Sequence, residues 1–167
     1  MADFGKACCF TGHRPQKLPW GYDESDGRCA AFKEKLQAVI CAVYESGITH
    51  FICGMALGCD MYCGEIVAEL MKQHPEITLE AAVPFADQAG SLRGRFRSRY
   101  DDLIAACSKV TLIQQSYTPG CMMRRNKYMV DNSAVLIACY DGQSGGTWNT
   151  IKYAMEQDKE VIQLPIE

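Results

Sequence analysis

Residues 48–60, Ile-Thr-His-Phe-Ile-Cys-Gly-Met-Ala-Leu-Gly-Cys-Asp, decide how the chain is expected to fold. A short apolar run over 48–53 leads through a loop with glycines at 54 and 58 into helical periodicity over 59–73. A strand that is apolar on both faces and leads directly into a helix is typical of a parallel sheet covered by helices. This stretch therefore predicts a strand, a glycine-containing turn and a helix.

The same alternation extends along the chain in both directions. Apolar runs predict further strands over 6–11, 78–83, 109–113, 134–139 and 161–164, and helical periodicity predicts helices over 25–46, 91–104, 121–132 and 147–157. Ser91 is the expected N-cap of the helix over 91–104. Six strands joined by helical crossovers predict an α/β, Rossmann-like three-layer sandwich with a mainly parallel sheet. We expect residues 1–167 to form a single domain.

Composition excludes several classes of protein. Hydrophobic residues make up 48% of the 167 residues and charged residues 22%, which is typical of a globular chain and not of a disordered one. The net charge of -3 disfavours nucleic-acid binding through a general basic field. Since there is neither an apolar run of about 18 residues nor a signal-peptide pattern, we expect no membrane association and a cytoplasmic location.

Ten cysteines invite a disulfide or metal interpretation. Several lie within apolar runs, as Cys8, Cys41 and Cys139 do, which favours reduced thiols buried in a core. A zinc site is the alternative, but the chain has no C-x-x-C pair, and Cys53, Cys59 and Cys63 have no fourth Cys close by in the sequence. We therefore expect no metal site.

Ligands of such folds bind at the carboxyl ends of the strands, where glycine-rich loops lead into helices. Gly54 and Gly58 allow a tight turn before a helix start that suits an anion such as phosphate. Asp60 has two readings, an acceptor for a ribose hydroxyl or a favourable charge at the helix start. Gly145, Gly146 and Thr147 form a second predicted anion cradle, and the alternative is a flexible loop with Thr147 as the N-cap.

The first predicted strand ends at the same edge in Thr11, Gly12, His13 and Arg14. The planar guanidinium of Arg14 suits a phosphate, whereas His13 has both a structural hydrogen-bonding and a chemical reading. Further basic residues follow in two groups, arginines at 93, 95, 97 and 99 and then Arg124, Arg125 and Lys127. These are either solvated helix faces or a local basic surface for a polyanionic ligand, an acidic partner or nucleic acid.

Four motifs, in this order, resemble the YpsA-like family of the SLOG superfamily, which also includes the DNA-processing protein DprA and the Lonely-guy phosphoribohydrolases. They are Phe10-Thr-Gly-His-Arg-Pro15, Gly54-x-x-x-Gly58-x-Asp60, the Pro84-Phe85 loop with Gln88, and Gly145-Gly-Thr147. The resemblance implies a Rossmann-like domain that binds a nucleotide or a nucleotide-derived, ADP-ribose-like ligand. It assigns ligand contacts to Thr11, Gly12, His13, Arg14, Gly54, Gly58, Asp60, Gln88, Gly145, Gly146 and Thr147.

The resemblance to the catalytic members is weaker. The second loop of Lonely-guy enzymes has a sequence similar to Pro-Gly-Gly-x-Gly-Thr-x-x-Glu. This chain has Ser144 in place of the Pro, and Lys152 and Tyr153 occupy the region where the carboxylate is expected. The resemblance therefore implies a cytosolic sensor or regulatory domain. Two alternatives stay open, a nucleotide N-glycosidase with Asp60 or Glu65 as acid or base and a DprA-like nucleic-acid-binding module using arginines 93–99. Catalytic residues are unassigned, no cofactor is certain, and a homo-oligomer is open.

Overall fold

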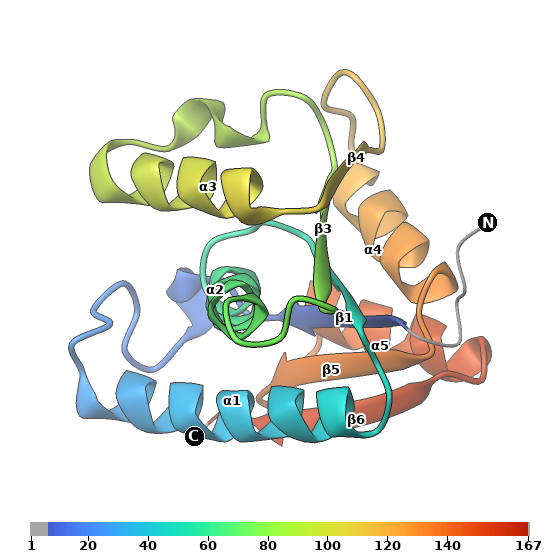
Figure 1. The fold of residues 1–167 in the computed structure, drawn as a ribbon. Coiled ribbons are helices and arrows are strands. Elements are labelled where there is room, and N and C mark those ends of the chain that lie inside the picture. The colour runs from blue at the N-terminus through green and yellow to red at the C-terminus, as the bar shows by residue number, and fades with distance from the viewer. Residues whose placement is uncertain (1–6, 167) are drawn as a thin grey trace.

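The computed structural model describes residues 7–166, which form one six-stranded sheet between two layers of helices (Figure 1). The strands are β1 (Ala7–Gly12), β2 (His50–Cys53), β3 (Thr78–Val83), β4 (Lys109–Leu112), β5 (Val135–Tyr140) and β6 (Glu160–Pro165). The helices are α1 (Gly27–Glu45), α2 (Cys59–Met71), α3 (Gly94–Ala106), α4 (Cys121–Asp131) and α5 (Gly146–Glu156).

Every pairing in the sheet is parallel, and the strand order is β4-β3-β2-β1-β5-β6. The chain moves outward from β1 to β4, then crosses back to β5 beside β1 and continues to β6. Because right-handed crossovers place helices on the face set by their direction, this reversal puts α1, α2 and α3 on one face and α4 and α5 on the other. The prediction of a Rossmann-like α/β fold is confirmed.

The four central strands β1, β2, β3 and β5 are buried on both faces, which explains their apolar runs, whereas Val110 and Leu112 on the edge strand β4 are exposed. Along β1, Cys8 and Phe10 face the larger core under α1 to α3, and Ala7 and Cys9 face the smaller core under α4 and α5. In the larger core the rings of Phe10 and Phe51 stack with their centroids 6.1 Å apart. A polar substitution on either face would place an unsatisfied group in an apolar core.

The cysteines are part of this packing. All ten are free thiols, eight of them buried, with Cys41 and Cys107 half-buried. Burial raises the pKa of Cys9 and of Cys63 to about 12, so both thiols stay protonated near neutral pH. Among residues 7–166 no cluster of His, Cys, Asp and Glu has the arrangement of a metal site, and no helix there could span a membrane.

Helix starts are where the sequence prediction needs correction. Ser91 does not cap a helix, because it is the last residue of a 3-10 turn over Gln88–Ser91. The amide of Leu92 donates to the carbonyl of Ala89 and closes that turn. Leu92 and Arg93 have extended backbones, and α3 begins only at Gly94. Within α3, Tyr100 and Leu103 are buried against the core.

One charged side chain lies deep in the sheet, the carboxylate of Glu80 on β3, with only 4% of the side chain exposed. His50 Nε2 lies 2.8 Å from Oε1, and the hydroxyls of Tyr128 and Thr111 donate to Oε2 at 2.5 and 2.8 Å. Burial alone would raise its pKa, but these hydrogen bonds lower the pKa of Glu80 to about 2. The network joins three strands to α4.

We predict that Glu80 gives the fold an acid-sensitive contribution to stability. Its folded pKa of about 2 is below the ordinary value of 4.5, so the contribution is complete above pH 4.5 and is lost as pH falls toward 2. Glu80→Gln should lower the free energy of unfolding by about 1–3 kcal/mol at neutral pH and flatten its decline below pH 4.5. Urea unfolding at several pH values measures both effects. Glu69→Gln, at an exposed carboxylate, is the control, and equal profiles for the two variants would contradict the prediction.

Candidate functional site

The strand order reverses between β1 and β5, and a cleft lies at the carboxyl ends of these strands. It consists of two hollows that share Arg14, Gln16, Ala56 and Met122. The first, which we call the polar chamber, has a volume of about 250 Å³ and is further lined by Thr11, Gly12, His13, Lys17, Asp60, Arg125, Asn126, Gly146 and Thr147. The second, the aromatic chamber, has a volume of about 500 Å³ and is further lined by Pro15, Tyr22, Met55, Leu57, Phe85, Gln88, Ser91, Leu92, Arg93 and Phe96.

Arg125 forms the floor of the polar chamber and is only 3% exposed. Its Nη1 donates to the carbonyl of Gly54, and its Nε donates to Asn126 Oδ1 at 2.7 Å. Asn126 in turn donates to the hydroxyl of Thr150 on α5 at 2.9 Å. Burial lowers the pKa of Arg125, whereas the carboxylate of Asp60 nearby opposes that shift. The result is a fixed guanidinium beside the end of β2 and near the start of α5.

Asp60 is the buried acid of the same chamber. Its Oδ2 accepts from the amide of Ala56 at 3.3 Å, and burial raises its pKa against the opposing charge of Arg125. Gly54 separates the two charges, since a Cβ there would lie 2.8 Å from Arg125 Nη1 and 2.9 Å from Asp60 Oδ2. Glycine at 54 therefore leaves room for the guanidinium of Arg125 and the carboxylate of Asp60.

His13 connects the loop after β1 to the loop after β5 by a side-chain hydrogen bond. Its side chain is 3% exposed, with Nε2 2.7 Å from Asp141 Oδ1 and Nδ1 3.4 Å from the hydroxyl of Thr147. Partial burial would raise the pKa of Asp141, but the hydrogen bonds from His13 and from the amide of Gln143 lower it. Both ring nitrogens thus contact the protein, which favours the structural reading of His13.

The loop over 54–58 packs against the loop that follows β1. Gly58 has φ +88, and a Cβ there would lie 2.6 Å from the carbonyl oxygen of His13 and 3.0 Å from Cα of Arg14. The amide of Cys59, the first residue of α2, donates to that same carbonyl at 3.2 Å. A Cβ at Gly12 would similarly lie 2.5 Å from Cβ of Cys59. Three of the predicted ligand glycines are therefore surrounded by protein atoms.

The start of α5 is open instead. A Cβ at Gly146 would meet nothing within 4 Å, and a Cβ at Gly145 would lie 2.9 Å from Lys17 Nζ. The N-cap is Gly145, with φ +145 and no side-chain cap, so Thr147 is not the N-cap and its hydroxyl contacts His13. The free amides and the positive end of the helix dipole thus face the polar chamber beside Lys17.

Gln88 lies on the wall of the aromatic chamber rather than in the polar one. Its amide nitrogen donates to the carbonyl of Gly54 at 3.1 Å, and its oxygen accepts from the hydroxyl of Tyr100 at 3.0 Å. The carbonyl of Gly54 therefore accepts from both Gln88 and Arg125. The Gln88 amide therefore joins the loop after β2 to α3.

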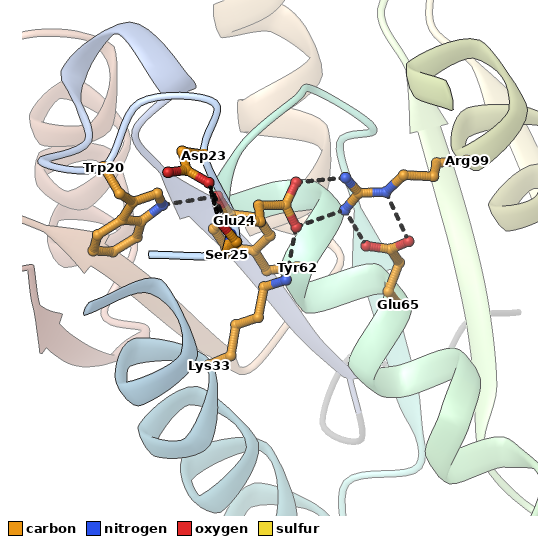
Figure 2. Close-up of polar contacts among 8 residues, drawn as sticks. All are labelled: Trp20, Asp23, Glu24, Ser25, Lys33, Tyr62, Glu65 and Arg99. Atoms are coloured by element: carbon orange, nitrogen blue, oxygen red, sulfur yellow. Dashed lines mark hydrogen bonds and ion pairs between the residues drawn. The ribbon is translucent and has the colours of Figure 1, made fainter. Parts of the chain in front are cut away.

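Two of the four arginines at 93–99 are neutralised by carboxylates, which weakens the reading of a common basic surface. Arg97 pairs with Asp101 at 3.1 Å, and Arg99 pairs with both Glu24 and Glu65 at 2.5 Å (Figure 2). Glu24 also pairs with Lys33 at 2.7 Å. Hydrogen bonds and charge from Glu65 and Glu24 raise the pKa of Arg99 despite its partial burial. Glu65, the alternative acid or base, lines neither chamber.

Sequence reasoning named Arg125 only as part of a possible basic surface, and it missed Lys17 and the rings of Tyr22 and Phe96 as cleft residues. A signal for Arg125 existed, because it lies four residues after Cys121 and four before Met129, both buried. An arginine on the apolar stripe of a helix is buried with a partner or faces a cavity. Lys17 and Tyr22 lie in the long connection between β1 and α1, and Phe96 lies on α3. Only the folded structure brings these two segments to the cleft.

Comparison with known proteins agrees with this architecture. The sequence model of the YpsA family, described as the YspA SLOG family, matches residues 8–167. Protein YoqJ, derived from the SPbeta prophage of Bacillus subtilis strain 168, is 31% identical over 137 residues, covering 72% of this chain and 80% of that protein. The UPF0398 protein BH1768 of Halalkalibacterium halodurans is 27% identical over 145 residues, covering 85% and 76%.

Two solved structures share the fold. DNA processing protein A of Helicobacter pylori superposes with a TM-score of 0.63 at 17% identity, over 99% of this chain and 67% of that one. DprA of Streptococcus pneumoniae gives 0.61 at 16% identity, over 98% of this chain and 51% of that one. At these identities the likeness extends to the fold alone.

We predict that Gly58→Ala destabilises the protein by about 3 kcal/mol or more, because it adds both backbone strain and a clash with the carbonyl of His13. Gly142→Ala is the matched control, since Gly142 has φ +91 but open space around its Cβ position. Only the strain, about 1–2 kcal/mol, is expected there. Thermal and urea unfolding compare the two variants, and an equal loss in both would show that the two loops do not meet closely.

Proposed function

The chain belongs to the YpsA SLOG family, and from that premise we propose that it binds a nucleotide-derived, ADP-ribose-like small molecule in the cleft at the carboxyl edge of the sheet. The observation that carries the proposal is the polar chamber, where the open start of α5 meets the buried guanidinium of Arg125 and the ammonium of Lys17. Backbone amides at a helix start and two cations are the groups that proteins use to hold phosphate.

The charges of this chamber favour an anion over a neutral ligand. Arg125 and Lys17 contribute two positive charges and Asp60 one negative charge, and Arg14 lies on the border with the aromatic chamber. A phosphate at the start of α5 would compensate the excess positive charge. Asp60 is then available to accept a hydroxyl, as a ribose would offer, in addition to the amide of Ala56.

We assign the chain a sensor or regulatory role in the cytoplasm. His13, Thr147 and Asp141 satisfy one another by hydrogen bonds, so they serve the shape of the chamber rather than offering a free acid and base. The cytoplasmic location is supported by ten free thiols, since that compartment keeps cysteines reduced.

A second candidate is hydrolysis of an N-glycosidic bond, and Asp60 is the observation that favours it. Burial raises the pKa of this carboxyl, which lies in a cleft beside a guanidinium, as is common for catalytic acids. Nucleic-acid binding is the weakest candidate. DNA processing protein A of H. pylori binds single-stranded DNA, but in this chain Arg97 and Arg99 are paired with acids.

We predict that Asp60→Asn distinguishes the first two candidates. If the chain only binds, incubation with AMP or ADP-ribose releases no adenine from either form, and the variant changes affinity by no more than about tenfold, the value of one hydrogen bond. Chromatography of the products measures release. Adenine released by the wild type and lost in Asp60→Asn would replace the sensor role with N-glycosidase activity.

We further predict that Lys17→Ala weakens binding of ADP-ribose by on the order of tenfold or more, because it removes a charge-assisted hydrogen bond to phosphate. Lys17 is exposed, so the substitution should leave folding intact. Isothermal titration calorimetry gives the dissociation constants, with Lys72→Ala on the exposed surface as control. The proposal fails if wild type does not bind, or if the two lysine variants bind equally well.

A further inference from the structure

The aromatic chamber adjoins the proposed phosphate site and is the larger half of the cleft. Three partly exposed rings, those of Tyr22, Phe85 and Phe96, line it together with the half-buried side chain of Leu57, and the buried side chain of Met55 lies behind them. Aromatic rings that face an open hollow keep unfavourable contact with water until a flat apolar surface covers them. The lining therefore points to a planar ligand group.

The rings occur in edge-to-face pairs, not as a loose collection. Tyr22 and Phe96 have centroids 5.7 Å apart with planes at 67°, and Phe85 packs in the same manner on Tyr117 at 5.3 Å and 79°. Gln16 donates to the hydroxyl of Tyr22 at 3.1 Å, and the guanidinium of Arg95 lies 5.0 Å from the ring centre of Phe96. Each pair fixes the orientation of a ring that borders the hollow.

A charge network holds the two elements that carry Tyr22 and Phe96. Tyr22 lies between Trp20, whose indole N–H donates to the hydroxyl of Tyr62 at 3.0 Å, and Glu24, which pairs with Arg99 (Figure 2). Arg99 lies three residues after Phe96 on α3, so the Glu24–Arg99 pair joins the Tyr22 segment to the Phe96 helix. Rings held in place before binding avoid the entropy cost of ordering them.

The rim of the hollow is polar. Arg14, Gln16, Ser91 and Arg93 border it, and Arg93 is folded back so that its Nη1 donates to the carbonyls of Gly90 and Leu92 at 2.8 Å. A nucleobase has the matching form, a flat π-face for the rings and a hydrogen-bonding edge for the rim. A lipid chain would leave this rim unsatisfied, and a bare sugar phosphate would leave the rings exposed.

We propose that the aromatic chamber is the nucleobase subsite of the cleft, with Tyr22 and Phe96 as its stacking residues. This inference rests on the proposed function, because the shared border at Arg14 places the base next to a phosphate at the start of α5. The ligand is therefore a base-bearing nucleotide, and a base-free sugar phosphate fills only half of the cleft. The occupant is a free nucleotide and not a nucleic-acid strand.

Methionine methyl groups test the proposal directly. Met55 is only 1% exposed and lies in the wall of the aromatic chamber and not of the polar one, close enough to sense a ring current, whereas Met155 on α5 is exposed and lines neither chamber. In protein labelled with ¹³C at the methionine methyls, adenosine and AMP should shift the Met55 signal by the ring current of the base, and ribose 5-phosphate should not. Met155 should not respond. An unmoved Met55 signal with both adenosine and AMP overturns the proposal.

Variants assign the effect to the rings. Phe96→Leu keeps an apolar side chain but removes the aromatic face, and it should weaken adenosine binding on the order of tenfold. Tyr22→Phe should bind as wild type, and Tyr44→Ala, which removes a ring tilted at 45° against His74 at the end of α1, should also have no effect. Unchanged adenosine binding in Phe96→Leu rejects stacking on that ring.

The same titrations separate this inference from the proposed function. If adenosine shifts Met55 but phosphate adds no affinity and Lys17→Ala has no effect, the base subsite stands and the phosphate site fails. If ribose 5-phosphate binds through Lys17 while adenosine and AMP leave Met55 unmoved, the reverse holds. A short single-stranded oligonucleotide that displaces adenosine at lower concentration than AMP does would assign the chamber to nucleic acid and overturn our choice of ligand.

Discussion

The close approach of two loops determines the shape of the cleft. The loop after β2 lies against the loop after β1 so tightly that a methyl group at Gly58 would lie 2.6 Å from the carbonyl oxygen of His13. That contact starts α2 directly beneath β1, because the amide of Cys59 donates to the same carbonyl. Asp60 then falls at the first turn of α2, inside the polar chamber. A Cβ at either Gly12 or Gly58 would force the loops apart.

The electrostatics of the cleft follow from this packing. Bringing Asp60 inward buries a carboxylate, and Arg125 from α4 supplies the compensating charge across Gly54. The charges of Asp60 and Arg125 offset each other. The ammonium of Lys17 and the positive start of α5 remain uncompensated, so the polar chamber retains an affinity for an anion. The charge of -3 for the whole chain gives no hint of this, since Glu24, Glu65 and Asp101 pair with arginines elsewhere. Local geometry, not net charge, therefore determines which ligands the cleft suits.

The long connection from His13 to Asp26 gives the cleft its second half. It has little regular structure, yet Trp20 anchors it to Tyr62 and Glu24 anchors it to Arg99 and Lys33 (Figure 2). Its length and its Pro, Trp and Gly residues were visible in the sequence, but its partners on α1, α2 and α3 were not. Each anchor joins residues that are distant in the sequence or lie on different elements, so no local pattern could identify them. The aromatic chamber was unforeseen for that reason.

The sequence by itself determined the fold and the edge of the sheet that carries the cleft. Apolar runs such as 48–53 and 78–83, each followed by a helical pattern, indicate strands buried on both faces, and glycine before a helix marks the carboxyl edge. Tertiary structure decided which glycines face a ligand, because only packing shows that Gly12, Gly54 and Gly58 meet protein atoms while Gly146 is open. It also decided that Arg99 serves the fold and Arg125 the cleft, since a charge takes its role from the groups around it, and those groups come from distant parts of the chain.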